Sequence, residues 1–217
     1  MTASPTDYDS PGMTSAPGTL VDPPVSRLGA LRLVASDIKI AHSVFALPFA
    51  VLAAFLAGRS IFIASEDAFG PGLFILGEFG GRLLLVLAAM VFARTVAMLA
   101  NRLWDREIDA RNPRTAGRAL PSGRLDVAAA RSIMAGCIVL FMLVCMGFGA
   151  IYGNWWPAIL GLPVLAWISL YGLAKRFTAL CHVWLGSSLA ISPLAAALAV
   201  EPAALTTMPA LWLLSAM

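Results

Sequence analysis

Long apolar runs, separated by short polar or charged segments, dominate the chain from residue 36 onward. Five of these runs approach the roughly 20 residues that an α-helix needs to cross a bilayer. We therefore predict helices over residues 36–58, 82–109, 126–151, 157–174 and 179–200. A sixth helix begins near residue 207, and we expect it to continue past Met217, because so short a run cannot cross the bilayer core.

Composition agrees with a membrane protein. Of the 217 residues, 59% are hydrophobic and only 12% are charged, whereas soluble domains carry about 25% charged residues. The mean hydropathy is +0.83. Because the apolar runs are continuous and do not alternate with polar positions, they predict helices and not the strands of a membrane barrel. The predicted fold class is therefore all-α, a polytopic transmembrane helical bundle in the lipid bilayer.

The remaining segments and the net charge say less about the fold and the function. Residues 1–26 are rich in Pro, Ser, Thr and Gly and have little to bury, so we predict a disordered tail. They contain no basic region followed by an apolar stretch, which argues against a signal peptide. Residues 59–81 form a Gly-rich connection. The net charge of +3 does not favour nucleic acid as a partner, because the basic residues lie in loops between apolar runs.

The loops between the helices predict an orientation. Basic residues gather before the first helix, between the second and third, and between the fourth and fifth, where Lys175 and Arg176 lie. Loops rich in Lys and Arg are retained in the cytoplasm. We therefore predict that these three loops face the cytoplasm and that the opposite loops hold Glu66, Asp67, Glu78 and Glu201.

One segment combines an apolar run with dense charge: Arg94 to Arg124, RTVAMLANRLWDREIDARNPRTAGRALPSGR. Asn101, Asp105 and Asp109 are spaced four apart, so at roughly 100° per residue they fall within about 80° of one another on one helical face. Arg94 precedes Asn101 by seven residues and joins this face, within roughly 20° of it.

The three oxygen-bearing side chains form a candidate magnesium site. Mg²⁺ prefers oxygen ligands and usually takes one or two carboxylates, which leaves positions for substrate phosphates. Arginines supply planar donor forks for the same phosphates, and four of them follow the helix: Arg111, Arg114, Arg118 and Arg124. The alternative is a helix end whose arginine loop serves orientation alone, although orientation does not require aspartates in helical register.

Other polar side chains lie at helix ends or within an apolar run. Tyr171 and Lys175 are one turn apart on the fourth helix, which is expected to end on the same side of the membrane as the aspartates. They could be an interfacial anchor and a topology marker, or they could contact a phosphate. Arg94 lies within an apolar run, where a charge is costly. We therefore expect Arg94 to have a functional role, with a carboxylate as its partner. Lys39 and His42 have no assigned role.

The Arg94–Arg124 segment resembles the first aspartate-rich motif of the UbiA-type membrane prenyltransferases, followed by the arginine loop RTAGRxLPSG of their 4-hydroxybenzoate polyprenyltransferase branch. It differs at Arg102, where many members have Asp, and at Ala119, where Pro is usual. The resemblance implies that residues 27–217 are the N-terminal part of a UbiA-type domain with nine helices in all. It also implies a second aspartate-rich motif after the sixth helix, which we expect beyond Met217.

The resemblance further implies a function: magnesium-dependent transfer of a polyprenyl group from a polyprenyl diphosphate to an aromatic acid, 4-hydroxybenzoate, in ubiquinone-type quinone biosynthesis. The active site would face the cytoplasm at a bacterial inner membrane. Alternatives are a naphthoate acceptor, as in menaquinone synthesis, and a transporter with an intramembrane charged path. The implied residues are magnesium ligands Asn101, Asp105 and Asp109, diphosphate contacts Arg114, Arg118, Tyr171 and Lys175, and the acceptor contact Arg94, with Asp105, Asp109 and Arg94 catalytic.

Overall fold

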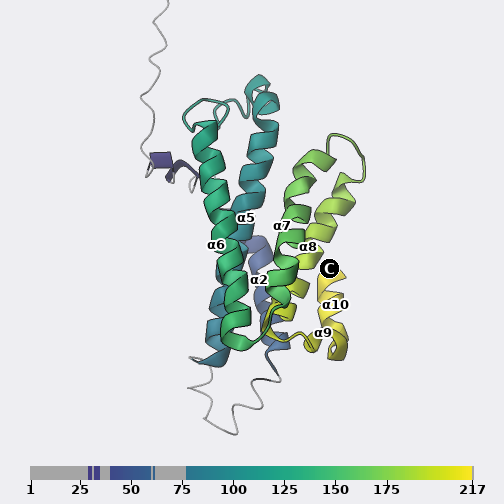
Figure 1. Ribbon diagram of the computed structural model, residues 1–217. Helices are drawn as coiled ribbons and strands as arrows, with labels where there is room; N and C mark the ends of the chain where they lie inside the picture. Colours follow the sequence, from purple (N-terminus) through teal and green to yellow (C-terminus); the bar gives the residue numbers. More distant parts are fainter. Residues whose placement is uncertain (1–28, 31, 35–39, 60, 62–76, 217) are drawn as a thin grey trace, which may run out of the picture.

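The computed structural model describes residues 29–30, 32–34, 40–59, 61 and 77–216 (Figure 1). The predicted 1–26 tail, Lys39 and most of the 59–81 connection lie outside these residues, and His42 lies within the first labelled helix. Within the described ranges the regular structure is helical, which confirms the all-α fold class. The elements are α2 (Ile40–Ala57), α5 (Glu78–Arg111), α6 (Val127–Tyr152), α7 (Trp156–Ala174), α8 (Cys181–Val200), α9 (Ala204–Thr207) and α10 (Pro209–Ala216).

The helix bounds agree closely with those predicted, except that α5 begins four residues before residue 82; the predicted start of the first helix at residue 36 lies outside the described residues. The two glycines in this stretch favoured a connection, because Gly is a poor helix former. The earlier start is stabilised by packing: Phe79 is buried in a core with the alanines of α2. Gly81 itself permits a close approach, since a Cβ there would lie 2.1 Å from the Tyr152 hydroxyl. Tertiary packing thus outweighs local propensity.

Among the described residues, four helices are long and apolar enough to cross a membrane: α5, α6, α7 and α8. The first predicted span is represented by a shorter apolar stretch, Leu47–Ala57 of α2. The predicted start of a sixth helix is divided into α9 and α10. Met208 between them is extended, with φ −122° and ψ 91°, as expected for a residue that precedes a proline.

Helix α5 lies along α6 and α7, whereas α2 packs against α8 (Figure 1). The α2–α8 contact is built from small residues, and Ala50, Ala53, Ala54 and Ala197 are fully buried there. Small side chains let the backbones of membrane helices approach closely, which is a principal way in which such helices associate. The contact therefore needs no large side chain at its centre.

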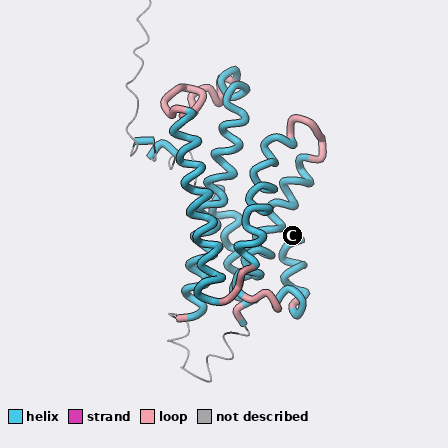
Figure 2. Tube along the Cα trace, in the orientation of Figure 1, coloured by secondary structure: helices cyan, strands magenta, loops and turns pink. Residues whose placement is uncertain are grey.

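The connections separate into two ends of the bundle. The α5–α6 and α7–α8 loops lie at one end, and the α6–α7 turn and the α8–α9 connection lie at the other (Figure 2). We call the first the charged end (residues 101–126 and 171–180) and the second the far end (residues 78–82, 152–156 and 198–203). The sequence placed the two basic loops on one side of the membrane, and in the structure they share an end.

Polar contacts at the far end join three helices and the α6–α7 turn. The Arg82 guanidinium donates to the Val200 carbonyl at 2.7 Å and lies over the Tyr152 ring, 4.6 Å from its centroid. The side-chain amide of Asn154 donates to the carbonyls of Leu198 and Ala199 at 2.8 and 3.0 Å. These donors satisfy carbonyls that the C-terminus of α8 leaves without helical partners. They therefore fix α8 relative to α5 and to the α6–α7 turn.

Candidate functional site

The last three turns of α5 present one polar face. Asp105 and Asp109 are only 9% and 8% exposed, whereas Trp104 and Ile108 beside them on the helix are open to the surroundings. Asn101 is half-buried one turn before Asp105. The predicted register is therefore observed, and both carboxylates point into the protein. Buried carboxylates require counter-charges, and these come from two different loops.

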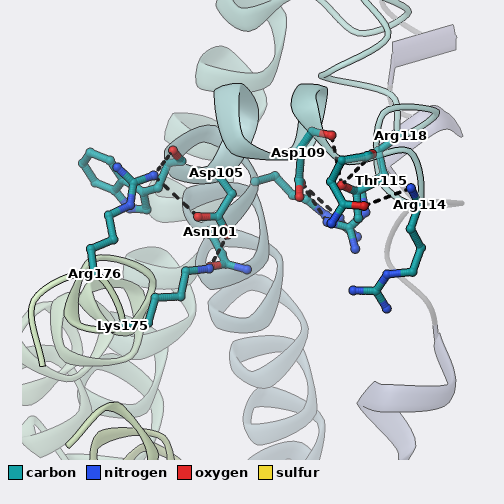
Figure 3. A network of polar contacts seen from close by, with 11 residues as sticks. Asn101, Asp105, Asp109, Arg114, Thr115, Arg118, Lys175 and Arg176 are labelled. Carbon is teal, nitrogen blue, oxygen red and sulfur yellow. Dashed lines mark hydrogen bonds and ion pairs between the residues drawn. The ribbon is translucent and has the colours of Figure 1, made fainter. Parts of the chain in front are cut away.

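Asp105 is held by the α7–α8 loop (Figure 3). The Lys175 ammonium forms an ion pair with Asp105 Oδ2 and donates to Asn101 Oδ1 at 3.1 Å. The Arg176 guanidinium lies 3.5 Å from Asp105 Oδ1 and donates to the Trp104 carbonyl. Two consecutive cations thus converge on one carboxylate. Lys175 was among the predicted site residues, whereas Arg176 had no predicted role.

A glycine on α7 makes this approach possible. Gly172 is buried against α5, and a Cβ there would lie 2.9 Å from Asn101 Oδ1 and 3.4 Å from Asn101 Cα. A Cβ at the first distance would require the Asn101 side chain to shift, so Gly172 favours the close approach of α7 to α5 that brings Lys175 to the carboxylate. The sequence signal for this contact is a glycine three residues before Lys175.

Asp109 is held by its own loop instead. Arg118 Nη1 lies 2.7 Å from Asp109 Oδ2, and Arg102 Nη1 lies 3.9 Å from the same oxygen. The buried hydroxyl of Thr115 donates to the Asp109 backbone carbonyl at 2.9 Å. The α5–α6 loop therefore folds back over the end of α5. Arg118 was predicted at this site, and Thr115 and Arg102 are additional contacts.

The other two predicted diphosphate contacts, Arg114 and Tyr171, make fewer polar contacts at the site. The Arg114 side chain is exposed and directed away from Asp109, and its backbone N–H donates to Asn112 Oδ1 at 3.0 Å (Figure 3). Tyr171 is half-buried on α7, one turn before Lys175. In the part of the chain that the structure describes, its phenol makes no hydrogen bond. Arg118 and Lys175 therefore lie at the carboxylates, whereas Arg114 and Tyr171 lie beside them.

Arg94 lies deeper in the bundle. By the helical rise it is roughly 10 Å from Asn101 along α5. Its side chain is half-buried, and its Nε is buried without a hydrogen-bond partner among the described residues. A buried donor that lacks a partner is destabilising, and a guanidinium within a membrane span is costlier still. A residue of this kind is suited to bind a ligand that completes its hydrogen bonds.

In a comparison with known protein families, residues 46–217 match the UbiA prenyltransferase family. The match covers most of the chain. The chain belongs to the UbiA prenyltransferase family. The resemblance noted in the Arg94–Arg124 segment thus extends over most of the described helices.

Individual relatives of this UbiA family member carry two different names. The chain is 29% identical over 119 residues to a mitochondrial 4-hydroxybenzoate polyprenyltransferase of Caenorhabditis elegans, over 55% of this chain and 30% of the relative. It is 36% identical over 120 residues to a protoheme IX farnesyltransferase of Synechococcus sp. (strain CC9902), over 54% of this chain and 36% of the relative. The matches thus span about a third of each relative's length.

A solved structure supports the same fold. The apo structure of a UbiA homolog from Aeropyrum pernix K1 matches with a TM-score of 0.59 and 28% identity, over 75% of this chain and 51% of that chain. Members of the UbiA family are prenyltransferases that generally use a divalent metal ion. The four apolar spans and this fold together make the chain an integral membrane protein.

The donor set at the charged end is compatible with a hard divalent cation. Two carboxylates and one amide oxygen lie on consecutive turns, and Mg²⁺ takes such oxygen ligands at sites that also bind phosphates. Asp105 Oδ1 is buried and accepts no hydrogen bond from the described residues, although Arg176 lies 3.5 Å away, so a lone pair remains for a ligand. The described residues contain no group of three His, Cys, Asp or Glu side chains suited to a metal, and the set therefore depends on the Asn101 amide.

Proposed function

We propose that this UbiA family protein transfers a polyprenyl group from a polyprenyl diphosphate to 4-hydroxybenzoate, with Mg²⁺, at the cytoplasmic face of a bacterial inner membrane. The observation that carries the proposal is the convergence of Lys175 and Arg118, from two separate loops, on the buried carboxylates Asp105 and Asp109. Such an arrangement provides both the anionic ligands for a metal and the cationic donors for a diphosphate. Family membership and the names of several relatives support it.

In this proposal Asn101, Asp105 and Asp109 hold the magnesium ion. When bound, the ion neutralises charge on the diphosphate leaving group. Lys175 and Arg118 donate to the diphosphate oxygens, and charge-assisted bonds of this kind strengthen as negative charge grows in the transition state. Arg114 is exposed on the same loop as Arg118 and can turn toward the outer phosphate. Tyr171 lies one turn before Lys175 on the same face of α7, where its phenol would also reach a bound diphosphate.

The acceptor is proposed to bind deeper, toward Arg94. Its carboxylate would accept from the Arg94 guanidinium, including the Nε that lacks a partner among the described residues. A bidentate Arg–carboxylate pair would fix the orientation of the acceptor ring. Beside Arg94, the apolar cluster of Val96, Phe141, Cys145 and Leu165 keeps the surroundings dry, which protects a carbocation-like prenyl group from water.

The identity of the acceptor has two rivals. A naphthoate would use Arg94 in the same way, because it also carries a carboxylate. Protoheme is a second candidate, because relatives named protoheme IX farnesyltransferase match at higher identity over a similar length. A comparison of turnover with 4-hydroxybenzoate, dihydroxynaphthoate and haem, at one donor concentration, discriminates among the three. The membrane-transporter alternative finds no support in the family match.

The test of the proposal is turnover by the full-length protein in detergent, followed as prenylated 4-hydroxybenzoate. We expect activity with Mg²⁺ and none in excess EDTA. Asp105→Asn should lower kcat by roughly 100-fold or more, because one metal ligand loses its charge. Arg131→Gln, an exposed basic residue outside the site, is the control. Undiminished turnover of Asp105→Asn, or full activity in EDTA, would refute the metal–diphosphate function.

A further inference from the structure

Asp105 and Asp109 each have two cations within 4.0 Å, but the two at Asp109 lie near one oxygen, Oδ2, whereas those at Asp105 face different oxygens. Lys175 is paired with Asp105 Oδ2, and Arg176 lies 3.5 Å from Asp105 Oδ1, so both oxygens face a cation. The side chain of Asp105 is only 12% exposed. Both cations come from the α7–α8 loop, so they belong to a different element from the carboxylate they neutralise.

A dication cannot simply be added to this arrangement. Mg²⁺ at Asp105 would stand beside the Lys175 ammonium and the Arg176 guanidinium, and like charges in a partly buried site repel strongly because solvent screens them poorly. The metal must therefore displace at least one cation from the carboxylate. A displaced ammonium that finds no new anion would leave the protein with uncompensated charge.

A diphosphate supplies that anion. Its oxygens can accept from Lys175 while the metal takes the place of Lys175 on Asp105. We propose that Lys175 is an exchangeable counter-ion: it neutralises Asp105 in the substrate-free state, moves to the diphosphate when metal and diphosphate bind together, and so opposes binding of the metal alone. This inference rests on the proposed function, because it assigns an additional role to one residue of that site.

Arg176 differs from Lys175 in how it is held. Its guanidinium donates to the Trp104 backbone carbonyl and also faces Asp105. Lys175 has a single compact ammonium on a four-carbon stem, with three donors that can be redirected. The structure therefore assigns exchange to Lys175 and positioning to Arg176, which keeps the α7–α8 loop on α5 while Lys175 changes partner.

The test measures binding and not turnover, with the full-length protein in detergent. Mn²⁺, which accepts a similar oxygen set, is titrated with and without inorganic pyrophosphate, and free Mn²⁺ is followed by electron paramagnetic resonance. In the unmodified protein, Mn²⁺ alone should bind weakly and pyrophosphate should raise its affinity. In Lys175→Gln, Mn²⁺ alone should bind about tenfold more tightly, and the gain from pyrophosphate should shrink, because no ammonium has to leave Asp105 when the metal binds.

Matched variants complete the design. Arg131→Gln removes the same charge at the same end of the bundle and should change neither affinity by more than about twofold. Lys175→Arg keeps the charge and should restore weak binding of Mn²⁺ alone. If Lys175→Gln does not fold, Lys175→Met removes the same charge with a side chain of similar length and should also tighten binding of Mn²⁺ alone.

The outcomes separate the two proposals. If the unmodified protein binds Mn²⁺ with pyrophosphate, but Lys175→Gln binds Mn²⁺ alone no better or more weakly, the exchange is refuted and the metal–diphosphate site stands. If the unmodified protein binds no Mn²⁺ even with pyrophosphate, the proposed function fails and the exchange fails with it. Tighter binding of Mn²⁺ alone in Lys175→Gln, reversed in Lys175→Arg, supports the exchange.

Discussion

The charged side chains of the candidate site differ in how their charges and hydrogen bonds are satisfied. Asp109 is neutralised locally by Arg118, Asp105 is neutralised from another loop by Lys175, and the Arg94 Nε has no hydrogen-bond partner among the described residues. A removed carboxylate would leave cations facing one another. A removed Arg94 would instead relieve a cost, since a buried donor without a partner destabilises the fold. Function and stability should therefore separate at Arg94.

Arg94→Leu tests this separation. Hydrogen bonds to charged groups contribute about 1.5–3 kcal/mol, so we expect the KM for 4-hydroxybenzoate to rise by about 10- to 100-fold. Thermal stability in detergent should stay the same or increase. Steady-state kinetics and a melting curve measure the two effects, with Arg94→Lys as the charge-retaining comparison. Equal loss of pyrophosphate affinity would instead assign Arg94 to the diphosphate or to the fold.

Pairs of helices determine whether the side chains meet. The end of α7 lies close to α5 at Gly172, where a Cβ would crowd the Asn101 side chain, and Lys175 follows this glycine by less than one turn. The contact between these elements is thus a precondition for the ion pair with Asp105. Thr115 has the corresponding role for the α5–α6 loop, because its buried hydroxyl bonds the Asp109 carbonyl.

Gly172→Ala should push α7 away from α5. The new Cβ would lie 2.9 Å from Asn101 Oδ1, and overpacking of this kind typically costs about 1–3 kcal/mol. We expect pyrophosphate affinity in the presence of Mg²⁺ to fall by about tenfold, as measured by calorimetry. Gly186→Ala on α8 is the matched control, because a Cβ there meets nothing within 4 Å. Unchanged affinity in Gly172→Ala would show that the close approach is unnecessary.

The sequence predicted the helices and the register of Asn101, Asp105 and Asp109 because both depend on local periodicity. It also placed Lys175 and Arg118 on one side of the membrane, since charge reports topology. It did not predict Arg176, Thr115 or Gly172. Their roles arise from the packing of α7 on α5 and from the fold of one loop, and those are long-range contacts with no periodic signal. The early start of α5 at Glu78 has the same origin, because buried Phe79 outweighs two glycines.

The bundle as a whole is joined at both ends. At the charged end the ion pairs link α5 to the α7–α8 loop, and at the far end Arg82 and Asn154 link α5 and the α6–α7 turn to the C-terminus of α8. Between the ends, the helices pack through apolar clusters, and small residues dominate the α2–α8 contact. Hydrogen bonds from Trp184 Nε1 to the Trp167 carbonyl and from Ser215 Oγ to the Ala190 carbonyl add polar links there. The polar contacts at the two ends therefore add to this packing in setting the register of the helices.

Asn154→Ala tests the far end. The substitution removes the donors to the Leu198 and Ala199 carbonyls, and an unpaired buried acceptor costs about 1–3 kcal/mol. In mixed detergent micelles, the variant should unfold at a lower fraction of denaturing detergent, while the folded protein keeps its pyrophosphate affinity. Ser132→Ala is the control, because that hydroxyl bonds only the Ala128 carbonyl of its own helix among the described residues. Equal stability of the two variants would show that the far-end contacts do not hold α8.

Orientation in the membrane is the last property of the whole molecule to test. The charged end is mostly basic, whereas the described ionisable residues near the far end are balanced in sign, as Arg59, Glu78, Arg82 and Glu201. Because positive loops are retained in the cytoplasm, we expect the charged end to face inward.

In a background with Cys137, Cys145 and Cys181 replaced by Ala, single cysteines are introduced at exposed Ser122, Ala179 and Ala203. A membrane-impermeant maleimide should label Ala203→Cys in bacterial spheroplasts. It should reach Ser122→Cys and Ala179→Cys only after lysis, since both loops share one end of the bundle. Labelling of Ser122→Cys and Ala179→Cys in intact spheroplasts would reverse the orientation, and labelling of only one of them would contradict the shared end itself.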